Sequence, residues 1–214
     1  MTPEPSETTS TEERRREQMV EHQLRGRGIE DERVLAAMRE VPRHRFLPRE
    51  LWADAYSDGA LPIGEGQTMS QPWIVAFMSE MLELHGDETV LEVGTGSGYG
   101  AAVLSRLCRK VVTIERHEPL AEAARAALAE IGCDNVEVRV GDGSAGAPEL
   151  APFGGIAVTA TADDDPPAAL RAQLAPRAAL VIPIRRGRQE RLVRIRDGRE
   201  EQLVPVRFVP LVGR

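Results

Sequence analysis

Residues 90–99 read VLEVGTGSGY, and the other segments of the chain can be placed relative to them. An apolar run stops at three glycines spaced by single residues, and helix-forming residues follow. This order predicts a buried strand, a tight turn and a helix. Glycine suits the turn because the backbone bends sharply there and can approach a ligand with no Cβ in the way. The helix would then point its free N–H groups at that ligand.

The spacing of these glycines separates two classes of ligand. The pattern is E-x-G-x-G-x-G, whereas the dinucleotide fingerprint is G-x-G-x-x-G. It resembles the first motif of S-adenosylmethionine (SAM) dependent methyltransferases. The resemblance implies SAM as the cofactor, bound by Glu92, Gly94, Thr95, Gly96, Ser97 and Gly98. On the motif alone, a glycine-rich turn without such a ligand is the alternative.

A second strand end carries a carboxylate at the spacing of a nucleoside site. Residues 111–115 form a short β-branched run that closes on Glu115, 21 residues after Gly94. In doubly wound folds a carboxylate about 20 residues past the first glycine binds the ribose hydroxyls. We therefore predict Glu115 as the ribose ligand, with Arg116 beside it at the cofactor. A solvated charge at a helix start is the alternative for Glu115.

A third strand end places an aspartate between glycines. Residues 136–140 read as a strand, and Gly141, Asp142 and Gly143 follow it. Open α/β sheets bind ligands in the crevice at the carboxyl ends of their strands. We predict that Asp142 accepts a hydrogen bond from the adenine amino group, with Gly143 next to it at the cofactor site.

The remaining runs define the fold class. Apolar runs at 156–160 and 178–183 predict a fourth and a fifth strand, and residues 189–195 and 202–208 predict a hairpin around Asp197-Gly198. Strands that alternate with helices indicate an α/β fold. We expect a doubly wound, mostly parallel, Rossmann-like sheet with an antiparallel C-terminal edge and a helical N-terminal addition.

Three regions are expected within one compact domain. Residues 1–11 are rich in Pro, Glu, Ser and Thr, which predicts a disordered tail and no signal peptide. Residues 12–84 form a helical, substrate-facing region, and residues 85–214 form the SAM-binding core.

The N-terminal region contains two predicted helices and most of the aromatic residues. Residues 12–27 carry an apolar stripe at helical spacing, and Asp31 is the predicted N-cap of a second helix. Aromatic side chains gather between residues 46 and 56. They indicate either a lid or docking surface, or a local core.

Composition excludes several function classes. The net charge is −7, whereas generic nucleic-acid binding needs a basic face. Cys108, Cys133 and the four histidines form no ligand pattern, so no metal site is predicted. No apolar run has the length of a membrane span. We expect a cytoplasmic monomer without a membrane or nucleic-acid partner.

Two hydroxyl residues precede the predicted helix at 74–84. Thr68 and Ser70 lie in the segment QTMSQP, beside a glycine and a proline. Either hydroxyl can serve as the helix N-cap. From these residues alone, we favour capping over catalysis.

Several segments together resemble one family, the protein-L-isoaspartate (D-aspartate) O-methyltransferases. The resemblance rests on ALPIGEGQTMSQP at 60–72, the glycine motif at 90–99, VGDG at 140–143 and VRFVPLV at 206–212. Residues 23–25 and 41–43 also fit, so it runs from about Met19 to the C-terminus. The segment around Ser70 is more diagnostic than the glycine motif.

The resemblance implies a substrate site and a reaction. Ser70 occupies the active-site serine position, Thr68 and Met69 line the isoaspartyl site, and the backbone of Val209, Pro210 and Leu211 holds the substrate peptide. The implied reaction transfers a methyl group from SAM to the α-carboxyl of an isoaspartyl residue and leaves S-adenosyl-L-homocysteine. The ester then loses methanol to give a succinimide, which hydrolyses in part to aspartate. The implied partners are damaged proteins or peptides.

This reaction needs few catalytic groups. An α-carboxyl with a pKa of about 3.3–3.7 is ionised near neutral pH, so no general base is required. Alignment of the reacting atoms can supply about 7–11 kcal/mol of barrier lowering. The Ser70 hydroxyl would orient the carboxylate without being modified. A serine hydrolase is not indicated, because the G-x-S-x-G elbow and a placed histidine are missing.

The chain departs from the family pattern at three places. Gly154 and Gly155 follow Phe153 where an aspartate is usual, and Gly100 stands where glutamine is more frequent. Residues 163–165 are all aspartate. This triplet would repel an anionic substrate or favour a basic peptide, or else it is a solvated acidic loop, which we favour.

Three other functions are weighed against repair. A dedicated methyltransferase that acts on an ordinary aspartate of one ribosomally made peptide would look similar in its SAM half. A SAM-binding module without catalysis is disfavoured by the intact motif residues. A DNA or RNA methyltransferase is disfavoured by the acidity and by the lack of an Asn/Asp-Pro-Pro-Tyr motif.

Overall fold

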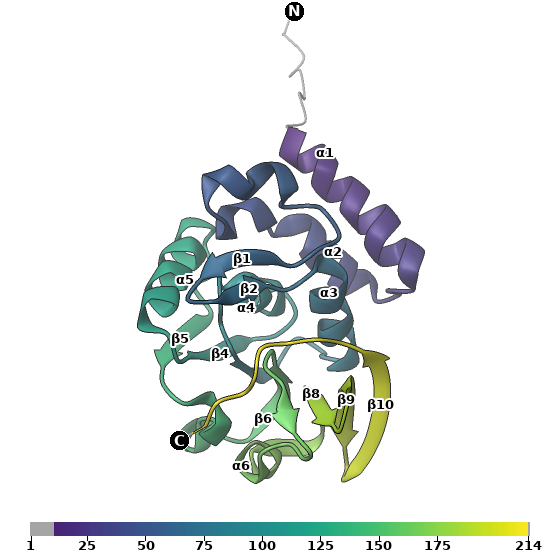
Figure 1. Cartoon of the computed structure of the whole chain (residues 1–214), viewed down its shortest axis with the longest axis vertical. Helices are drawn as coiled ribbons and strands as arrows, with labels where there is room; N and C mark the ends of the chain where they lie inside the picture. The colour runs from purple at the N-terminus through teal and green to yellow at the C-terminus, as the bar shows by residue number, and fades with distance from the viewer. Residues whose placement is uncertain (1–10, 214) are drawn as a thin grey trace, which may run out of the picture.

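The computed structural model describes residues 11–213, and its centre is a twisted sheet (Figure 1). The strands of this main sheet are β3 (Thr89–Val93), β4 (Lys110–Glu115), β5 (Val136–Val140), β6 (Phe153–Val158), β7 (Ala162–Asp163), β8 (Leu174–Arg186), β9 (Gln189–Arg196) and β10 (Arg199–Pro205). Their order is β10-β9-β8-β6-β3-β4-β5, with β7 beside β8.

The pairing of these strands confirms the predicted fold class. β8, β6, β3, β4 and β5 are parallel, and the β8-β9 and β9-β10 pairs are antiparallel. Asp197 and Gly198 have φ of 48° and 73° and form the predicted turn between β9 and β10. The fifth predicted strand is longer than expected: β8 extends to Arg186 and forms a further antiparallel hairpin with β9.

Helices and short turns surround the sheet. Before β3 the chain forms α1 (Thr11–Gln18), the π-helical turn η1 (Met19–Leu24), η2 (Arg25–Arg27), α2 (Glu32–Glu40), η3 (Arg43–Phe46), η4 (Arg49–Asp54), the hairpin strands β1 (Leu61–Gly64) and β2 (Gln67–Met69), and α3 (Pro72–Met81). After β3 it forms α4 (Tyr99–Leu104), α5 (Glu118–Glu130), η5 (Gly143–Ala145), η6 (Pro148–Leu150) and α6 (Ala168–Ala172).

Alternation along each strand divides the buried residues into two cores. Val90 and Val181 pack in the core that includes residues of α2, α3 and α4, whereas Leu91 and Leu180 pack in the core that includes Leu170 of α6. A strand buried on both faces needs an apolar residue at nearly every position, which explains the continuous apolar runs of the sequence.

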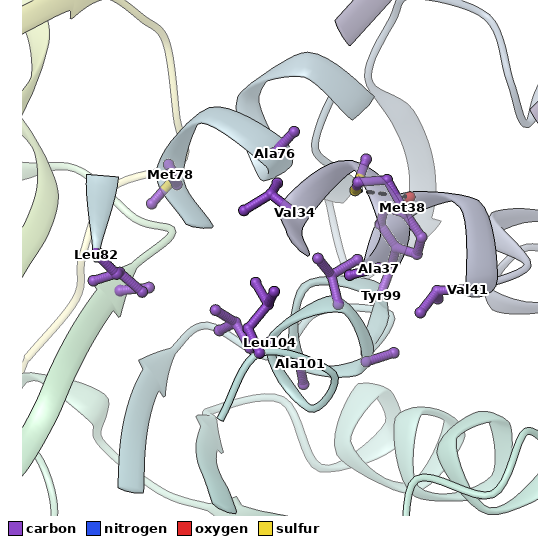
Figure 2. Close-up of a cluster of buried hydrophobic side chains, with 14 of the residues drawn as sticks. Val34, Ala37, Met38, Val41, Ala76, Met78, Leu82, Tyr99, Ala101 and Leu104 are labelled. Carbon is purple, nitrogen blue, oxygen red and sulfur yellow. Dashed lines mark hydrogen bonds between the residues drawn. The ribbon is translucent and has the colours of Figure 1, made fainter. Parts of the chain in front are cut away.

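Figure 2 shows part of the first core, where α2, α3 and α4 meet. The labelled side chains include Val34 and Met38 of α2, Ala76 of α3 and Leu104 of α4. The Tyr99 hydroxyl donates to Met38 Sδ over 3.5 Å. This packing joins the N-terminal helices to the helix that follows the glycine turn.

The N-terminal helix differs from the prediction. Residues 12–27 were predicted as one helix, but α1 ends at Gln18 and the chain continues through a π-helical turn and a 3-10 turn to Gly28, whose φ is 90°. The predicted apolar stripe is buried, at Met19, Val20 and Leu24. Residues 1–10 of the predicted disordered tail lie outside the described residues, and Thr11 begins α1.

The next helix begins as predicted. Asp31 accepts hydrogen bonds on its side chain from the backbone N–H of Arg33 (2.8 Å) and Val34 (3.4 Å), so it is the N-cap of α2.

The aromatic segment forms a local core. His44 lies edge-on to Trp52 with ring centroids 4.7 Å apart, and its Nδ1 is 2.7 Å from the Tyr56 hydroxyl. Phe46 lies edge-on to Tyr99 at 5.7 Å. These contacts favour the local-core interpretation over a lid.

No helix among residues 11–213 has the length and apolar character that a membrane span requires.

Gly154 and Gly155 of β6 lie where neighbouring side chains leave little space for a Cβ. A Cβ added at Gly154 would lie 2.5 Å from Glu88 Cγ and 2.6 Å from Glu88 Cβ. The Glu88 carboxylate is held by the backbone N–H groups of His85 (2.6 Å) and Gly86 (2.8 Å), so this side chain cannot move away freely. The departure at Gly154 therefore has a packing reason.

We expect Gly154→Ala to lower the free energy of unfolding by about 1–3 kcal/mol, because the new methyl group overlaps a fixed neighbour. Urea denaturation of both proteins measures the difference. Gly59→Ala is the matched control, since within residues 11–213 no atom other than those of its chain neighbours lies within 4 Å of its added Cβ. Equal stability changes for the two variants would contradict the packing account.

Candidate active site

A cavity of about 750 Å³ lies at the carboxyl ends of the central strands. Its walls come from the ends of β3, β4 and β6, the β1-β2 hairpin with the start of α3, and the C-terminal segment, residues 205–212. Figure 1 shows this segment, in yellow, running back across the molecule from the end of β10. Elements far apart in sequence thus enclose one site.

The glycine turn forms the floor of the cavity. Gly94 has a φ of 94°, and a Cβ there would lie 2.3 Å from Thr159 Oγ1. The Thr159 hydroxyl donates to the carbonyl of Gly94 (2.8 Å) and lies 3.1 Å from that of Val93. The turn therefore requires glycine on two grounds, the left-handed backbone and the close approach of β6.

The other glycines of the motif have different roles. Gly96 donates its N–H to Glu115 Oε2 over 2.8 Å and lines the cavity. Gly98 does not line the cavity; a Cβ there would lie 3.2 Å from Ala124 Cβ, so it lets α4 begin close to α5. Thr95 and Ser97, the other predicted cofactor residues of the motif, also line the cavity.

Glu92 is a buried carboxyl group in the cavity wall. It is 2% exposed, and Thr113 Oγ1 donates to its Oε2 over 2.6 Å. The Thr113 hydroxyl is also 2.7 Å from that of Thr95, which extends the chain of polar contacts to the glycine turn. Burial raises the pKa of Glu92 to about 8, and the charge of Glu115 acts in the same direction.

Glu115 lies at the end of the neighbouring strand. It is 4% exposed, and its two oxygens accept the backbone N–H groups of Gly96 (2.8 Å) and His117 (3.0 Å). Each carboxylate oxygen has a second lone pair, so both can accept a further hydrogen bond. Arg116 is exposed and lines the cavity beside Glu115.

Asp142 is placed differently from the other predicted ligands. Its Oδ1 accepts from the N–H (2.9 Å) and the hydroxyl (2.7 Å) of Ser144, so it caps the turn η5. It does not line the cavity, whereas its neighbour Gly143 does. A Cβ on Gly143 would lie 2.4 Å from Val93 Cγ1, so glycine lets this turn approach β3.

The three predicted substrate residues of the hairpin gather at the same cavity. Thr68, Met69 and Ser70 all line it. The N-cap of α3 is Gln71, and no side chain bonds to this helix start. The capping interpretation of Thr68 and Ser70 is therefore wrong, because the helix begins later, at Pro72. Within residues 11–213 the Ser70 hydroxyl has no hydrogen-bond partner.

The C-terminal residues Val209, Pro210 and Leu211 also line the cavity. The N–H of Thr161 donates to the carbonyl of Val209, and the N–H of Leu211 donates to the carbonyl of Thr161, both over 2.8 Å. Glu190 Oε1 accepts from the Thr161 hydroxyl and from the N–H of Phe208, both over 2.6 Å. These bonds hold the C-terminal segment against the end of β6.

The acidic triplet lies outside the cavity lining. Arg185 pairs with Asp163 at 3.3 Å and Arg186 with Asp165 at 3.9 Å, and Arg186 Nε donates to the carbonyl of Asp164. Arginines of β8 thus partly balance its charge. This placement favours the interpretation of a solvated acidic loop.

Sequence reasoning missed several residues of the cavity. Trp73 stacks on Phe77 with centroids 4.7 Å apart, and the Arg27 guanidinium lies 4.9 Å from the Trp73 ring. Other missed members are Tyr99, His117, Thr159 and Arg207. The position of Thr159 just after an apolar strand was a signal for it, since residues at the carboxyl ends of parallel strands face the crevice. Within residues 11–213, no three or more His, Cys, Asp or Glu residues gather as metal ligands would.

Comparison with solved structures places this fold among known ones. A protein-L-isoaspartate O-methyltransferase structure is 30% identical with a TM-score of 0.81, over 92% of this chain and 66% of that one. A Plasmodium falciparum structure in complex with S-adenosyl-L-homocysteine is 24% identical with a TM-score of 0.80, over 92% of this chain and 98% of that one, and shares the fold.

Comparison of sequences gives the family. The model of the protein-L-isoaspartate(D-aspartate) O-methyltransferase family matches residues 14–214. A relative named protein-L-isoaspartate O-methyltransferase from Methanoregula boonei is 53% identical over 208 residues, 95% of this chain and 94% of the relative. One of the same name from Opitutus terrae is 51% identical over 200 residues, 91% of this chain and 85% of the relative.

With this sheet, glycine turn and pair of buried carboxyl groups, the chain is a SAM-dependent methyltransferase of the Rossmann-like type. The β1-β2 hairpin and the C-terminal segment line the same cavity as the glycine turn. The chain belongs to the protein-L-isoaspartate (D-aspartate) O-methyltransferase family.

The raised pKa of Glu92 predicts how pH changes the stability of the cofactor-free chain. Between its ordinary pKa of 4.5 and its folded pKa of about 8, the folded chain holds a proton that the unfolded chain has released. This group therefore makes the free energy of unfolding fall as pH rises through that window. We expect the Tm of Glu92→Gln minus that of wild type to increase from pH 5 to pH 8 in thermal scans. A constant difference would contradict the raised pKa.

The same group predicts the pH dependence of cofactor binding. SAM carries a sulfonium and an ammonium charge, which favour the ionised form of Glu92. Wild-type affinity for SAM should rise from pH 6 to pH 8 with release of a proton, and Glu92→Gln should lose this rise. Calorimetry in two buffers with different ionisation enthalpies measures the proton release; equal proton release by both proteins would contradict the prediction.

Proposed function

We propose that the chain starts the repair of isoaspartyl sites in damaged proteins, with Ser70 orienting the substrate carboxylate beside the cofactor. The observation that carries the proposal is the unpartnered Ser70 hydroxyl in the wall of the cavity that the glycine turn also lines. The enzyme is a SAM-dependent carboxyl methyltransferase, as its family membership states.

The charges of the cavity fit both reactants. Glu92 and Glu115 are 2% and 4% exposed, and they lie at the strand ends where a cofactor with a sulfonium and an ammonium charge would bind. Arg27, Arg116 and Arg207 line the same cavity but are exposed. Anionic groups therefore lie on the buried side and cationic groups on the solvent side, where an anionic peptide enters.

The glycine turn and Glu115 would hold the nucleoside part of SAM. Glu115 would accept from the ribose hydroxyls with the lone pairs that Gly96 and His117 leave, and Arg116 would lie at the rim. Glu92, Thr95, Ser97 and Gly143 line the remaining cofactor wall. Gly98 and Asp142 lie outside the cavity lining and would support the cofactor site by shaping the backbone at the start of α4 and at η5.

When bound, SAM supplies an activated methyl group: the substrate oxygen forms a bond to the methyl carbon while the carbon–sulfur bond breaks and its electron pair stays on sulfur. The protein contributes orientation. Ser70 would donate to one oxygen of the substrate carboxylate, which leaves the other oxygen to face the methyl group. The backbone of Val209, Pro210 and Leu211 would hold the peptide on the opposite side. No side chain has to remove a proton, because the carboxyl group is already ionised near neutral pH.

A dedicated peptide methyltransferase is the second candidate, and family membership across nearly the whole chain favours repair over it. A SAM-binding module without catalysis is disfavoured, because both the cofactor and the substrate walls of the cavity are present. A cytoplasmic location, a monomeric state and the lack of a nucleic-acid partner stay predictions from the sequence.

Methyl transfer from labelled SAM to two matched peptides tests the proposal, one with isoaspartate and one with aspartate. Wild type should label the isoaspartyl peptide alone. Ser70→Ala should lower kcat/KM by about tenfold to a hundredfold, the effect of losing one hydrogen bond to a charged group, about 1.5–3 kcal/mol. The Kd for S-adenosyl-L-homocysteine should stay within threefold.

Ser57→Ala is the matched control, because Ser57 is an exposed serine outside the cavity and this variant should keep wild-type activity. Labelling of the aspartyl peptide by wild type would contradict repair and support a dedicated substrate. An unchanged kcat/KM in Ser70→Ala would contradict the role of its hydroxyl and leave the family activity untouched.

A further inference from the structure

Arg43 is a fully buried cation outside the cavity lining. It lies in η3 with 0% exposure. Its Nε donates to the carbonyl of Ala55 over 2.7 Å, and its Nη2 donates to the carbonyl of Ser70 over 2.8 Å. Its guanidinium lies 4.8 Å from the centroid of the Tyr99 ring. Among residues 11–213 no carboxylate pairs with it, and its Nη1 is buried without a partner.

Such a group is costly to bury. A cation removed from water without a counterion destabilises a fold, and an apolar side chain of similar volume would avoid that cost. Burial lowers the pKa of Arg43 to about 10, so the guanidinium still carries its charge at neutral pH. The contribution of this side chain therefore lies in what its donors and its ring contact hold in place.

The contacts of Arg43 reach two parts of the cavity wall, the segment at Ser70 and the start of α4 at Tyr99. Ser70 ends the hairpin segment on the substrate side, whereas Tyr99 is the first residue of α4, directly after the glycine turn on the cofactor side. Ser70 and Tyr99 both line the cavity, and Arg43 touches both from behind. We propose that Arg43 is a positioning residue that sets the place of the Ser70 segment relative to the glycine turn. The proposal rests on the substrate-orienting role proposed above for Ser70.

Methyl transfer makes this distance matter. The reacting oxygen, methyl carbon and sulfur must align, and a displacement of about 1 Å by a distant change can cost about a hundredfold in rate. Arginine suits the task because its planar guanidinium directs several donors at fixed angles and also stacks on an aromatic ring. Lysine would keep the charge but could not reproduce both carbonyl bonds and the ring contact.

A purely structural role makes a different prediction from a positioning role. Structural loss lowers Tm and leaves kcat of the folded fraction unchanged. Loss of positioning lowers kcat while the cofactor site, which is built on the sheet, keeps its affinity. Arg33 offers a matched control, because it also donates to two backbone carbonyls, of Leu84 (2.5 Å) and Leu107 (2.8 Å), but does not line or touch the cavity wall.

The test measures kcat, peptide KM, Kd for S-adenosyl-L-homocysteine and Tm for Arg43→Met, Arg43→Lys and Arg33→Met. We expect both Arg43 variants to lose at least tenfold in kcat, with the Kd within threefold of wild type. Arg33→Met should lower Tm and keep kcat within twofold. In the double variant Arg43→Met with Ser70→Ala, the loss in kcat should be smaller than the product of the two single losses, because both act on one alignment.

Several results would overturn the proposal. These are an unchanged kcat in Arg43→Met, full activity in Arg43→Lys, or an equal loss of kcat in Arg33→Met. Failure of both Arg43 variants to fold would also count against it, since the arginine would then act on the whole fold. If Ser70→Ala alone keeps wild-type activity, the proposed role of the Ser70 hydroxyl fails, while the kcat values of the Arg43 variants still decide whether the segment is positioned by Arg43.

Discussion

The close approach of glycine backbone to neighbouring side chains at the carboxyl ends of the central strands is the constraint on which the site depends. A Cβ at Gly94 would meet the Thr159 hydroxyl at 2.3 Å, and a Cβ at Gly143 would meet Val93 at 2.4 Å. At Gly100 it would meet the Glu92 carboxylate at 2.4 Å. Because glycine has no Cβ at these three positions, β3, β6, η5 and α4 come close enough together to form the floor of the cavity. The departure at Gly100 thus belongs to the same constraint, since it leaves space for Glu92.

The close packing of these strand ends also explains why the carboxyl groups of the site are buried. Glu92 and Glu115 end up on adjacent parallel strands, with the hydroxyls of Thr113 and Thr95 between the sheet and the turn. Burial makes the charged form of Glu92 unfavourable until a cation approaches. A cationic cofactor is therefore favoured at the buried end, and the exposed arginines leave the open end to an anionic peptide.

Local patterns predicted what depends on local structure. Apolar runs predicted where strands of the main sheet lie along the chain, Asp197-Gly198 marked the hairpin, and Asp31 marked a helix start. The prediction that Ser70 caps the following helix was wrong, because α3 starts two residues later, at Pro72. The helix prediction for residues 12–27 also joined α1 to the turn that follows it, whereas the whole apolar stripe, Met19, Val20 and Leu24, lies in the π-helical turn.

Contacts between distant segments lie beyond such patterns. Glu190 of β9 holds the C-terminal segment only because the fold brings Thr161 and Phe208 within hydrogen-bond distance of its carboxylate. Arg43 reaches Ser70 across 27 positions of sequence. Neither Glu190 nor Arg43 belongs to a motif with a readable spacing. Asp142 has a structural role that its spacing did not indicate, because its Oδ1 caps the η5 turn, and its contact with adenine stays a prediction.

A crystal structure of the chain with S-adenosyl-L-homocysteine and an isoaspartyl peptide tests the central claim most directly. The account predicts ribose hydroxyls on Glu115, and the substrate α-carboxylate between the Ser70 hydroxyl and the cofactor sulfur, with the peptide backbone along residues 209–211. A carboxylate bound away from Ser70, or a nucleoside seated at the exposed end of the cavity, would contradict it.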